Sequence, residues 1–329
     1  MSFFKSRRFL LSSLMVAMGL SMPLTPVWAQ SFPSKPVRIV IGFPPGGGID
    51  IVARTIAPKL SEALGQPVII DNKPGVAGVL GTNLVAKAPA DGHTIFFGTT
   101  GNISINPVFM PNLPFSMDKD FTPLMLVASL PFLVYAHPSV PVKNLSELVA
   151  YAKANPGKVN FYSSGNGGLP HLTGELLNNV AGIQTVHIAY KGSAPGMNDL
   201  IGGQVQLGYD TVAIGLQHIK TGRLRALATT GPKRLAILPD VPSTSEFASG
   251  LEAVNWYGMV VPAGTPREAI LRLNRELTKV LEMPDIKEKL VSQGIDPAAN
   301  SPEEFGEFMK SEAAKWARVI RAANIKPDS

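Results

Sequence analysis

Short apolar runs alternate along the chain with segments in which apolar residues recur every three or four positions. The β-branched run 37–41 is typical of a buried strand, and the four-residue spacing of apolar residues from Val52 to Leu64 marks one face of a helix. The alternation continues: we expect strands at 67–70, 93–97, 159–162, 185–190, 205–209, 224–229 and 256–261, and helices at 76–87, 170–181, 195–202 and 212–220. This order predicts parallel or mixed sheets covered by helices on both faces.

Longer elements are indicated in the middle and at the end of the chain. Residues 124–137 form one apolar, extended segment, long enough to run from one domain into another. After residue 261 helices dominate. Three predicted helix starts carry capping boxes, formed by Asn144 with Glu147, Thr265 with Glu268, and Ser301 with Glu304.

The first 29 residues have the features of an export signal. A basic start is followed by an uncharged apolar run over 9–24 and by small residues, Val27 and Ala29, at the −3 and −1 positions of a cleavage site. The apolar run is shorter than the roughly 20 residues that span a bilayer, so a membrane anchor is the weaker alternative. The sequence predicts a signal peptide cleaved after Ala29 and a periplasmic protein, and it leaves the Sec and twin-arginine routes open.

Composition narrows the classes of function. The 329 residues include 30 Lys and Arg and 24 Asp and Glu, and the net charge of +6 falls to +3 without the three basic residues of the signal. No dense run of Lys and Arg remains, which argues against nucleic acid as a partner. The absence of cysteine excludes disulfides, thiolate metal sites and cysteine nucleophiles. A length of 329 residues suggests two domains.

Two glycine-rich turns have the same setting. Residues 42–50 and 163–171 each lie between the carboxyl end of an expected strand and the amino end of an expected helix, the edge where ligands bind in open α/β sheets. Free N–H groups and the helix dipole favour an anion there, and glycine allows close approach. Two such turns, one per domain, could grip one anion, although each could also be a plain connector.

Motifs of enzymes and of nucleotide sites are missing. The sequence contains no G-x-G-x-x-G, no phosphate-binding P-loop, no G-x-S-x-G elbow and no H-E-x-x-H pair, and its five histidines are scattered. We therefore expect no catalysis, no cofactor and no metal. An exported α/β hydrolase is the enzymatic alternative, and it predicts ester turnover that is lost in Ser164→Ala.

The stretch 43–54, FPPGGGIDIVAR, closely resembles the first-loop signature of the tripartite tricarboxylate transporter substrate-binding proteins, also called the Bug family. Further matching segments follow in the same order: 72–75, 90–92, 165–171, 190–192 and Asp210. The resemblance covers essentially the whole chain after the signal. It implies an α/β, two-lobed periplasmic binding protein type II fold (a Venus flytrap), in which each lobe is a mixed sheet flanked by helices. The expected lobes are 30–132 with 255–329, and 133–254.

The resemblance also implies a function. We expect a solute-binding protein that captures a small carboxylate-bearing metabolite, closes on it, and delivers it to the integral membrane subunits of a tripartite transporter. A periplasmic sensor that reports the solute to a two-component kinase is the alternative that the sequence cannot separate. A monomer is expected in either case.

Candidate ligand contacts are carried over position by position. They are Phe43, Pro44, Gly46, Gly47 and Asp50 in the first turn, Ser164, Asn166, Gly168 and His171 in the second, and Thr99, Thr100, Tyr190 and Asp210 in the cleft between them. Gly48 departs from the commoner form, which has serine or threonine there, so a hydroxyl contact at this position is in doubt. Asp50 could instead cap its helix. Asp210 and His171 likewise stay open between ligand contact and a structural role.

Overall fold

The computed structural model describes residues 32–327 except 111 and 191–192, so the predicted signal peptide lies outside the described residues. The strands are β1 (Val37–Ile41), β2 (Val68–Asn72), β3 (Thr94–Thr99), β4 (Phe121–Ala136), β5 (Asn160–Ser163), β6 (Val186–Ala189), β7 (Leu207–Thr211), β8 (Arg225–Thr229), β9 (Val254–Pro262) and β10 (Asp296–Pro297). The helices are α2 (Gly48–Leu64), α3 (Val79–Ala86), α4 (Asn106–Phe109), α5 (Met117–Asp120), α6 (Leu145–Ala154), α7 (Leu169–Ala181), α8 (Ser193–Ile201), α9 (Val212–Lys220), α10 (Arg267–Glu282), α11 (Pro284–Val291) and α12 (Pro302–Ala322), with short turns of helix η1 (Val76–Gly78), η2 (Gly101–Ile105) and η3 (Thr244–Glu246).

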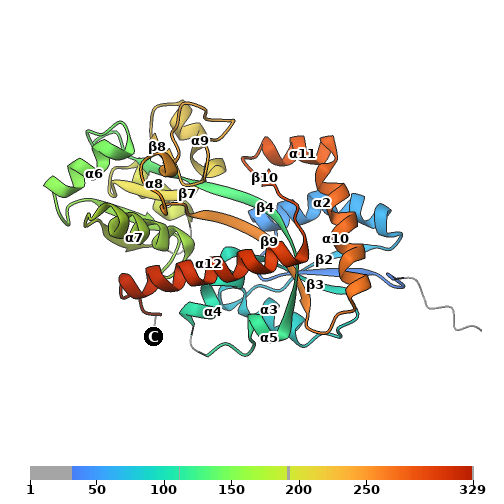
Figure 1. Cartoon of the computed structure of the whole chain (residues 1–329). Helices are drawn as coiled ribbons and strands as arrows, with labels where there is room; N and C mark the ends of the chain where they lie inside the picture. Colours follow the sequence, from blue (N-terminus) through green and yellow to red (C-terminus); the bar gives the residue numbers. More distant parts are fainter. Residues whose placement is uncertain (1–31, 111, 191–192, 328–329) are drawn as a thin grey trace, which may run out of the picture. The chain divides into compact units, whose positions relative to one another are not determined.

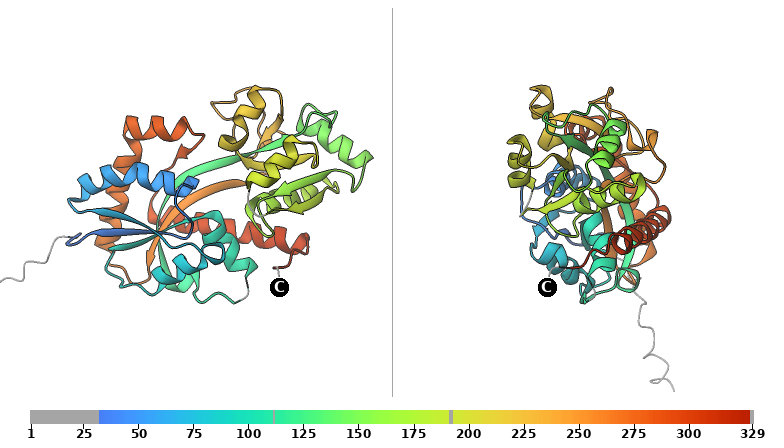
Figure 2. Two further views of the ribbon diagram at one scale, coloured as in Figure 1. Left: turned by 180° about the vertical axis from the view of Figure 1, so that it is seen from behind. Right: turned by 90° about the vertical axis from the view of Figure 1, so that its left-hand side faces the viewer.

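The strands form one mixed sheet in two parts. Its order is β2-β1-β3-β9-β4-β7-β5-β6, and β8 and β10 both pair with β4. The first half-sheet consists of β2, β1, β3, β9 and β10, and the second of β7, β5, β6 and β8. Strand β4 belongs to both, because Phe121–Pro131 pairs with β9 while Phe132–Ala136 pairs with β7. In Figures 1 and 2 the long strands β4 and β9 run from one group of helices to the other.

Alternation along the strands buries both faces of each half-sheet. In β1, Val37, Ile39 and Ile41 join a core with α2, α10 and α11, whereas Val40 faces a second core on the other side. In β4, Phe132 and Val134 face one core and Leu133 and Tyr135 the opposite one. Successive side chains of a strand point to opposite faces, so helices must cover both sides. The predicted mixed sheets flanked by helices are present.

Helix α12 packs on the cores of both halves. Phe305 and Met309 join a core of the first half-sheet, and Trp316, Val319 and Ile320 join a core of the second. The buried carboxylate of Glu312 accepts hydrogen bonds from the indole N–H groups of Trp256 on β9 (3.0 Å) and of Trp316 (3.1 Å), and it pairs with Lys315. Figure 1 shows the helix extending along both groups of elements.

Glu312→Ala should lower the free energy of unfolding by about 3 kcal/mol, because two buried indole N–H groups lose their acceptor. Glu312→Gln keeps an oxygen acceptor and should cost less. The exposed Glu307→Ala is the matched control, with a change within about 0.5 kcal/mol. Urea unfolding measures all three, and equal losses in Glu312→Ala and Glu307→Ala would contradict the role of this carboxylate.

One of the three predicted capping boxes is wrong. Asn144 and Ser301 cap their helices as expected, each accepting from the N–H of the glutamate three residues on. Helix α10, however, begins at Arg267 with Pro266 as N-cap, and the hydroxyl of Thr265 donates to the carbonyl of Pro262 (2.7 Å). The helix starts one residue later than predicted, so this threonine ends the turn after β9 instead of capping α10.

Candidate functional site

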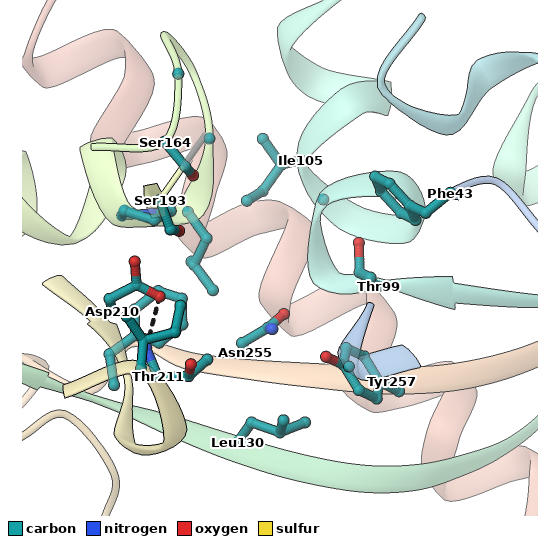
Figure 3. Close-up of a pocket in the computed structure, with 18 of the residues that line it drawn as sticks. Phe43, Thr99, Ile105, Leu130, Ser164, Ser193, Asp210, Thr211, Asn255 and Tyr257 are labelled. Atoms are coloured by element: carbon teal, nitrogen blue, oxygen red, sulfur yellow. Dashed lines mark hydrogen bonds between the residues drawn. The ribbon is translucent and has the colours of Figure 1, made fainter. Parts of the chain in front are cut away.

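A cavity of about 850 Å³ lies between the two half-sheets, and residues from both line it. One wall contains Phe43, Thr99 and Tyr257, and the other contains Ser164 and Asp210 (Figure 3). Among the described lining residues there is no Lys, Arg or His, and Asp210 is the one carboxylate. Backbone groups and short polar side chains therefore supply most of the polarity of the walls.

The first wall is built by the turn between β1 and α2. Gly47 is the N-cap in an extended conformation, and no side chain caps this end of the helix among the described residues. The first intrahelical hydrogen bond runs from the N–H of Ile51 to the carbonyl of Gly47 (3.0 Å). The N–H groups of residues 48–50 come before it and have no acceptor within the helix. Gly48 lines the cavity beside Tyr257. This turn thus brings the positive end of a helix dipole to the cavity.

The second wall repeats this arrangement with the turn between β5 and α7. Gly168 is the extended N-cap, again without a side-chain cap, and the N–H of Leu172 bonds to its carbonyl (3.0 Å). Residues 164–170 all line the cavity. A positive φ of 69° makes glycine necessary at Gly167, where a Cβ would also lie 2.2 Å from the ring of Phe109. Two helix N-termini, one from each half of the fold, therefore border a single cavity.

The structure brings six of the thirteen predicted contact residues into the cavity wall: Phe43, Thr99, Ser164, Asn166, Gly168 and Asp210. The other seven do not line it: Pro44, Gly46, Gly47, Asp50, Thr100, His171 and Tyr190. Direct ligand contact by any of the thirteen stays a prediction. Within the second set, Pro44, Gly46 and Gly47 are exposed, whereas hydrogen bonds of Asp50, Thr100, His171 and Tyr190 support segments of the walls.

The contacts of these supporting residues are specific. The hydroxyl of Thr100 accepts from the N–H of Trp256 (2.9 Å), which ties η2 to β9. His171 accepts from the N–H of Gly167 through Nδ1 (3.1 Å) and stacks on His187 with ring centroids 3.6 Å apart. The hydroxyl of Tyr190 donates to Asp199 (2.6 Å). Each of these contacts fixes a segment that borders the cavity.

Asp50 holds the shape of the first turn. It is buried, and its carboxylate accepts from the N–H of Gly46 (2.9 Å), Nε of Arg54 (2.8 Å) and Nδ2 of Asn72 (3.0 Å). Burial alone would raise the pKa of Asp50, but the hydrogen bonds from Arg54, Gly46 and Asn72 outweigh it and hold the pKa below its usual value. The ionised carboxylate therefore stabilises the folded turn.

Asp50→Asn should lower the free energy of unfolding by about 2 kcal/mol at pH 7, since it removes a charge-assisted network. The pKa of Asp50 is lower in the folded protein than in the unfolded chain. Its ionised carboxylate therefore stabilises the fold fully above the unfolded-state pKa of about 4, and this stabilisation is lost as the pH falls through the folded-state pKa. The gap between wild type and variant should thus shrink from pH 7 to pH 3. Urea unfolding at both pH values, with the exposed Asp240→Asn as control, measures it, and a gap independent of pH would refute this role.

The sequence did not single out several lining residues. Asn255 and Tyr257 come from β9, Asn102 from η2 and Ser193 from α8. Thr211 is the N-cap residue of α9, but its side chain makes no capping hydrogen bond. Between Asn255 and Tyr257 on β9, Trp256 is buried and packs in a core with Phe305. Asn255 and Tyr257 face the cavity while Trp256 does not, because successive side chains of a strand point to opposite faces of the sheet.

No metal or membrane site emerges from the residues that the structure describes. They contain no group of three His, Asp or Glu side chains placed to hold a metal ion. None of the helices within them is both long enough and apolar enough to cross a bilayer.

Comparison with known proteins places this site in context. The model of the "Tripartite tricarboxylate transporter family receptor" matches residues 52–325. A protein of Pseudomonas sp. strain P51, described as "UPF0065 protein in tcbD-tcbE intergenic region", is 40% identical over 293 residues, which are 88% of this chain and 87% of that protein.

Solved structures agree over most of the chain. "R. palustris Rpa4515 with adipate" is 34% identical with a TM-score of 0.78 and covers 90% of this chain and 100% of its own. "Periplasmic binding protein BugD" is 34% identical with a TM-score of 0.74 and the same coverage. "MatC (Rpa3494) from Rhodopseudomonas palustris with bound malate" is 29% identical with a TM-score of 0.73, and covers 88% and 100%. These similarities confirm the predicted α/β fold of periplasmic binding proteins.

Proposed function

This chain belongs to the tripartite tricarboxylate transporter receptor family, and we propose that it captures a small carboxylate between its two half-sheets and delivers it to a tripartite membrane transporter. The family consists of solute-binding receptors and not of enzymes. The proposal concerns the chemical class of the solute, the residues that hold it and the partner that receives it.

One observation carries the proposal: the N-termini of α2 and α7 border the same cavity, and neither has a side-chain cap among the described residues. Each N-terminus has backbone N–H groups that precede the first intrahelical hydrogen bond and about half a positive charge, and Pro170 leaves α7 with one such N–H fewer than α2. An anion between them gains both without a lysine or arginine. The adipate and malate in the similar structures support a carboxylate as that anion.

We further propose that the two halves act as lobes, 30–132 with 255–329 and 133–254. In support, β4 changes partner from β9 to β7 between Pro131 and Phe132, and β9 begins at Val254. A ligand that touches both lobes binds the closed arrangement more tightly than the open one and so shifts the population toward it. The transporter would then recognise the closed form.

The proposed place of action is the periplasm, after export by the N-terminal signal. The similarity to a protein described as a periplasmic binding protein supports this location. The membrane subunits of a tripartite transporter are the proposed partners, and we propose that the receptor acts as a monomer. A strain that lacks the protein should take up the bound acid more slowly, whereas a purely sensory role would leave the uptake rate unchanged at constant transporter level.

Calorimetry against paired ligands tests the anion claim. The panel contains linear dicarboxylates, hydroxy acids and aromatic acids, each with its neutral amide. We expect at least one acid to bind with its amide weaker by more than about 100-fold, which corresponds to roughly 2.7 kcal/mol. Equal affinity for acid and amide, or binding of a sugar or metal ion with no bound carboxylate, would refute the proposed function.

A further inference from the structure

The cavity has a strongly uneven chemical character. Apart from the two glycine-rich turns, its walls are mainly apolar, with side chains from both halves that include Ile105, Phe109, Leu130, Phe132, Ile214 and Ile237. Asp210 is the one charged side chain among the described lining residues. A ligand held at the helix N-termini by its carboxylate therefore meets apolar surface and a single acidic group beyond them.

Asp210 is held rigidly in this wall. It stands in β7, is 3% exposed, and its carboxylate lies below Ser193 in Figure 3. Oδ1 accepts from the N–H of Thr211 (2.7 Å) and Oδ2 from the hydroxyl of Tyr162 (3.2 Å). Burial raises the pKa of Asp210 above its usual value, and the hydrogen bonds from Ser193, Thr211 and Tyr162 offset this rise only in part. Because donors already approach both oxygens, Asp210 presents an acceptor to the cavity.

An acceptor in a wall whose described residues include no cation discriminates between ligand groups. Ser193, Thr211 and Tyr162 already donate to Asp210, and a carboxylate has about four acceptor sites, so about one site remains for a hydroxyl or amine of the ligand. A second ligand carboxylate would face a like charge across a short distance in a partly desolvated site, with no Lys, Arg or His among the described lining residues to offset it. An apolar group would leave the remaining acceptor capacity of Asp210 without a partner.

We propose that Asp210 makes this cavity selective for monocarboxylates with an apolar body and a distal hydrogen-bond donor, a hydroxyl or an amine, over dicarboxylates of the same length. The proposal rests on the proposed function, because the first carboxylate is assigned to the helix N-termini. It adds the chemistry of the other end of the ligand. The acids in the similar structures, adipate and malate, carry two carboxylates, so this selectivity would distinguish the chain from those proteins.

Ligand series of constant length test this selectivity by calorimetry. One series is hexanoate, 6-hydroxyhexanoate, 6-aminohexanoate and adipate, and the other is benzoate, 4-hydroxybenzoate, 4-aminobenzoate and terephthalate. In the series that binds, the hydroxy or amino acid should bind at least about tenfold more tightly than the dicarboxylate and than the unsubstituted acid.

Asp210→Asn assigns the selectivity to this residue. Asparagine keeps an oxygen for the N–H of Thr211 but has no charge, so the preference over the dicarboxylate should fall below about threefold. Asp240→Asn, an exposed position outside the cavity, should leave every ratio unchanged. Circular dichroism and thermal melting confirm that the variants fold, and the wild-type ratios test the selectivity independently of them.

Each outcome has a distinct meaning. A wild-type protein that binds the dicarboxylate as tightly as the hydroxy or amino acid overturns this inference and leaves the proposed function standing. Unchanged ratios in a folded Asp210→Asn variant also overturn it. Failure of every carboxylate in both series to bind, together with failure of the wider acid panel, overturns the proposed function and this inference together.

Discussion

Gly48→Val should weaken carboxylate binding by at least about 100-fold while the protein stays folded. Gly48 is the first residue of α2 and lines the cavity, and a Cβ built there would lie 2.6 Å from the hydroxyl of Tyr257. A branched side chain at this point must displace Tyr257 and cover the helix N-terminus that we assign to the carboxylate. Calorimetry measures the binding, and thermal melting shows whether the fold survives.

A pair of milder variants separates lost binding from lost packing. In Gly48→Ala the close contact is with the hydroxyl of Tyr257, and the next atom of that ring lies at 3.7 Å, an ordinary contact. The double variant Gly48→Ala with Tyr257→Phe should therefore recover the melting temperature lost in Gly48→Ala. Gly202→Ala is the control, because a Cβ there would lie at ordinary distances from the carbonyl oxygens of Asn198 (3.4 Å) and Asp199 (3.7 Å) and the residue does not line the cavity. Full affinity in a folded Gly48→Val protein would show that this turn is only a connector.

Gly167→Ala should lower both stability and affinity, because two costs coincide there. The left-handed φ of 69° costs about 1–2 kcal/mol with a Cβ, and the overlap with the ring of Phe109 adds about 1–3 kcal/mol. Relief of the overlap moves the 164–168 turn, which lines the cavity, so affinity should fall by at least about tenfold. Urea unfolding and calorimetry give the two numbers.

Gly182→Ala is the matched control at the opposite end of the same helix. Gly182 is the C-cap of α7 with a similar φ of 61°, and a Cβ there would meet nothing within 4 Å. It should show the conformational cost alone and no change in affinity. If Gly167→Ala shows the same loss of stability as Gly182→Ala and the same unchanged affinity, the close packing of Phe109 on the second turn does not contribute to ligand binding.

Local patterns in the sequence were enough to locate the two glycine-rich turns and most of the regular elements. Turn chemistry and helix starts depend on neighbouring residues, so 42–50 and 163–171 could be placed correctly between their strands and helices. The long apolar segment at 124–137 also corresponds to β4, which pairs with strands of both half-sheets. The prediction that this segment runs from one domain into another rested on the length of the apolar run.

Elements with weak local signals were not predicted. The segment 101–109 forms η2 and α4, two helices of only five and four residues that have no room for a periodic pattern. It nevertheless supplies Asn102, Ile105 and Phe109 to the cavity. The helix expected at 76–87 is divided instead, because Gly78 with φ 87° separates η1 from α3.

The remaining cavity residues depend on tertiary arrangement. Asn255 and Tyr257 reach the site only because β9 runs antiparallel between β3 and β4, a neighbour relation between segments more than one hundred residues apart in sequence. Conversely, His171 lies next to the second turn in sequence, but its ring stacks on His187 and bonds to the N–H of Gly167 without lining the cavity itself. Proximity along the chain does not determine where a side chain points.

The central claim is that helix N-termini from both halves hold one carboxylate, and a crystal structure with the tightest-binding acid tests it most directly. The account predicts carboxylate oxygens about 2.7–3.2 Å from N–H groups of residues 48–50 and of residues 165–169 or 171, or linked to them through one ordered water. A carboxylate held by only one of these turns, or bound outside the cavity between the half-sheets, would contradict it.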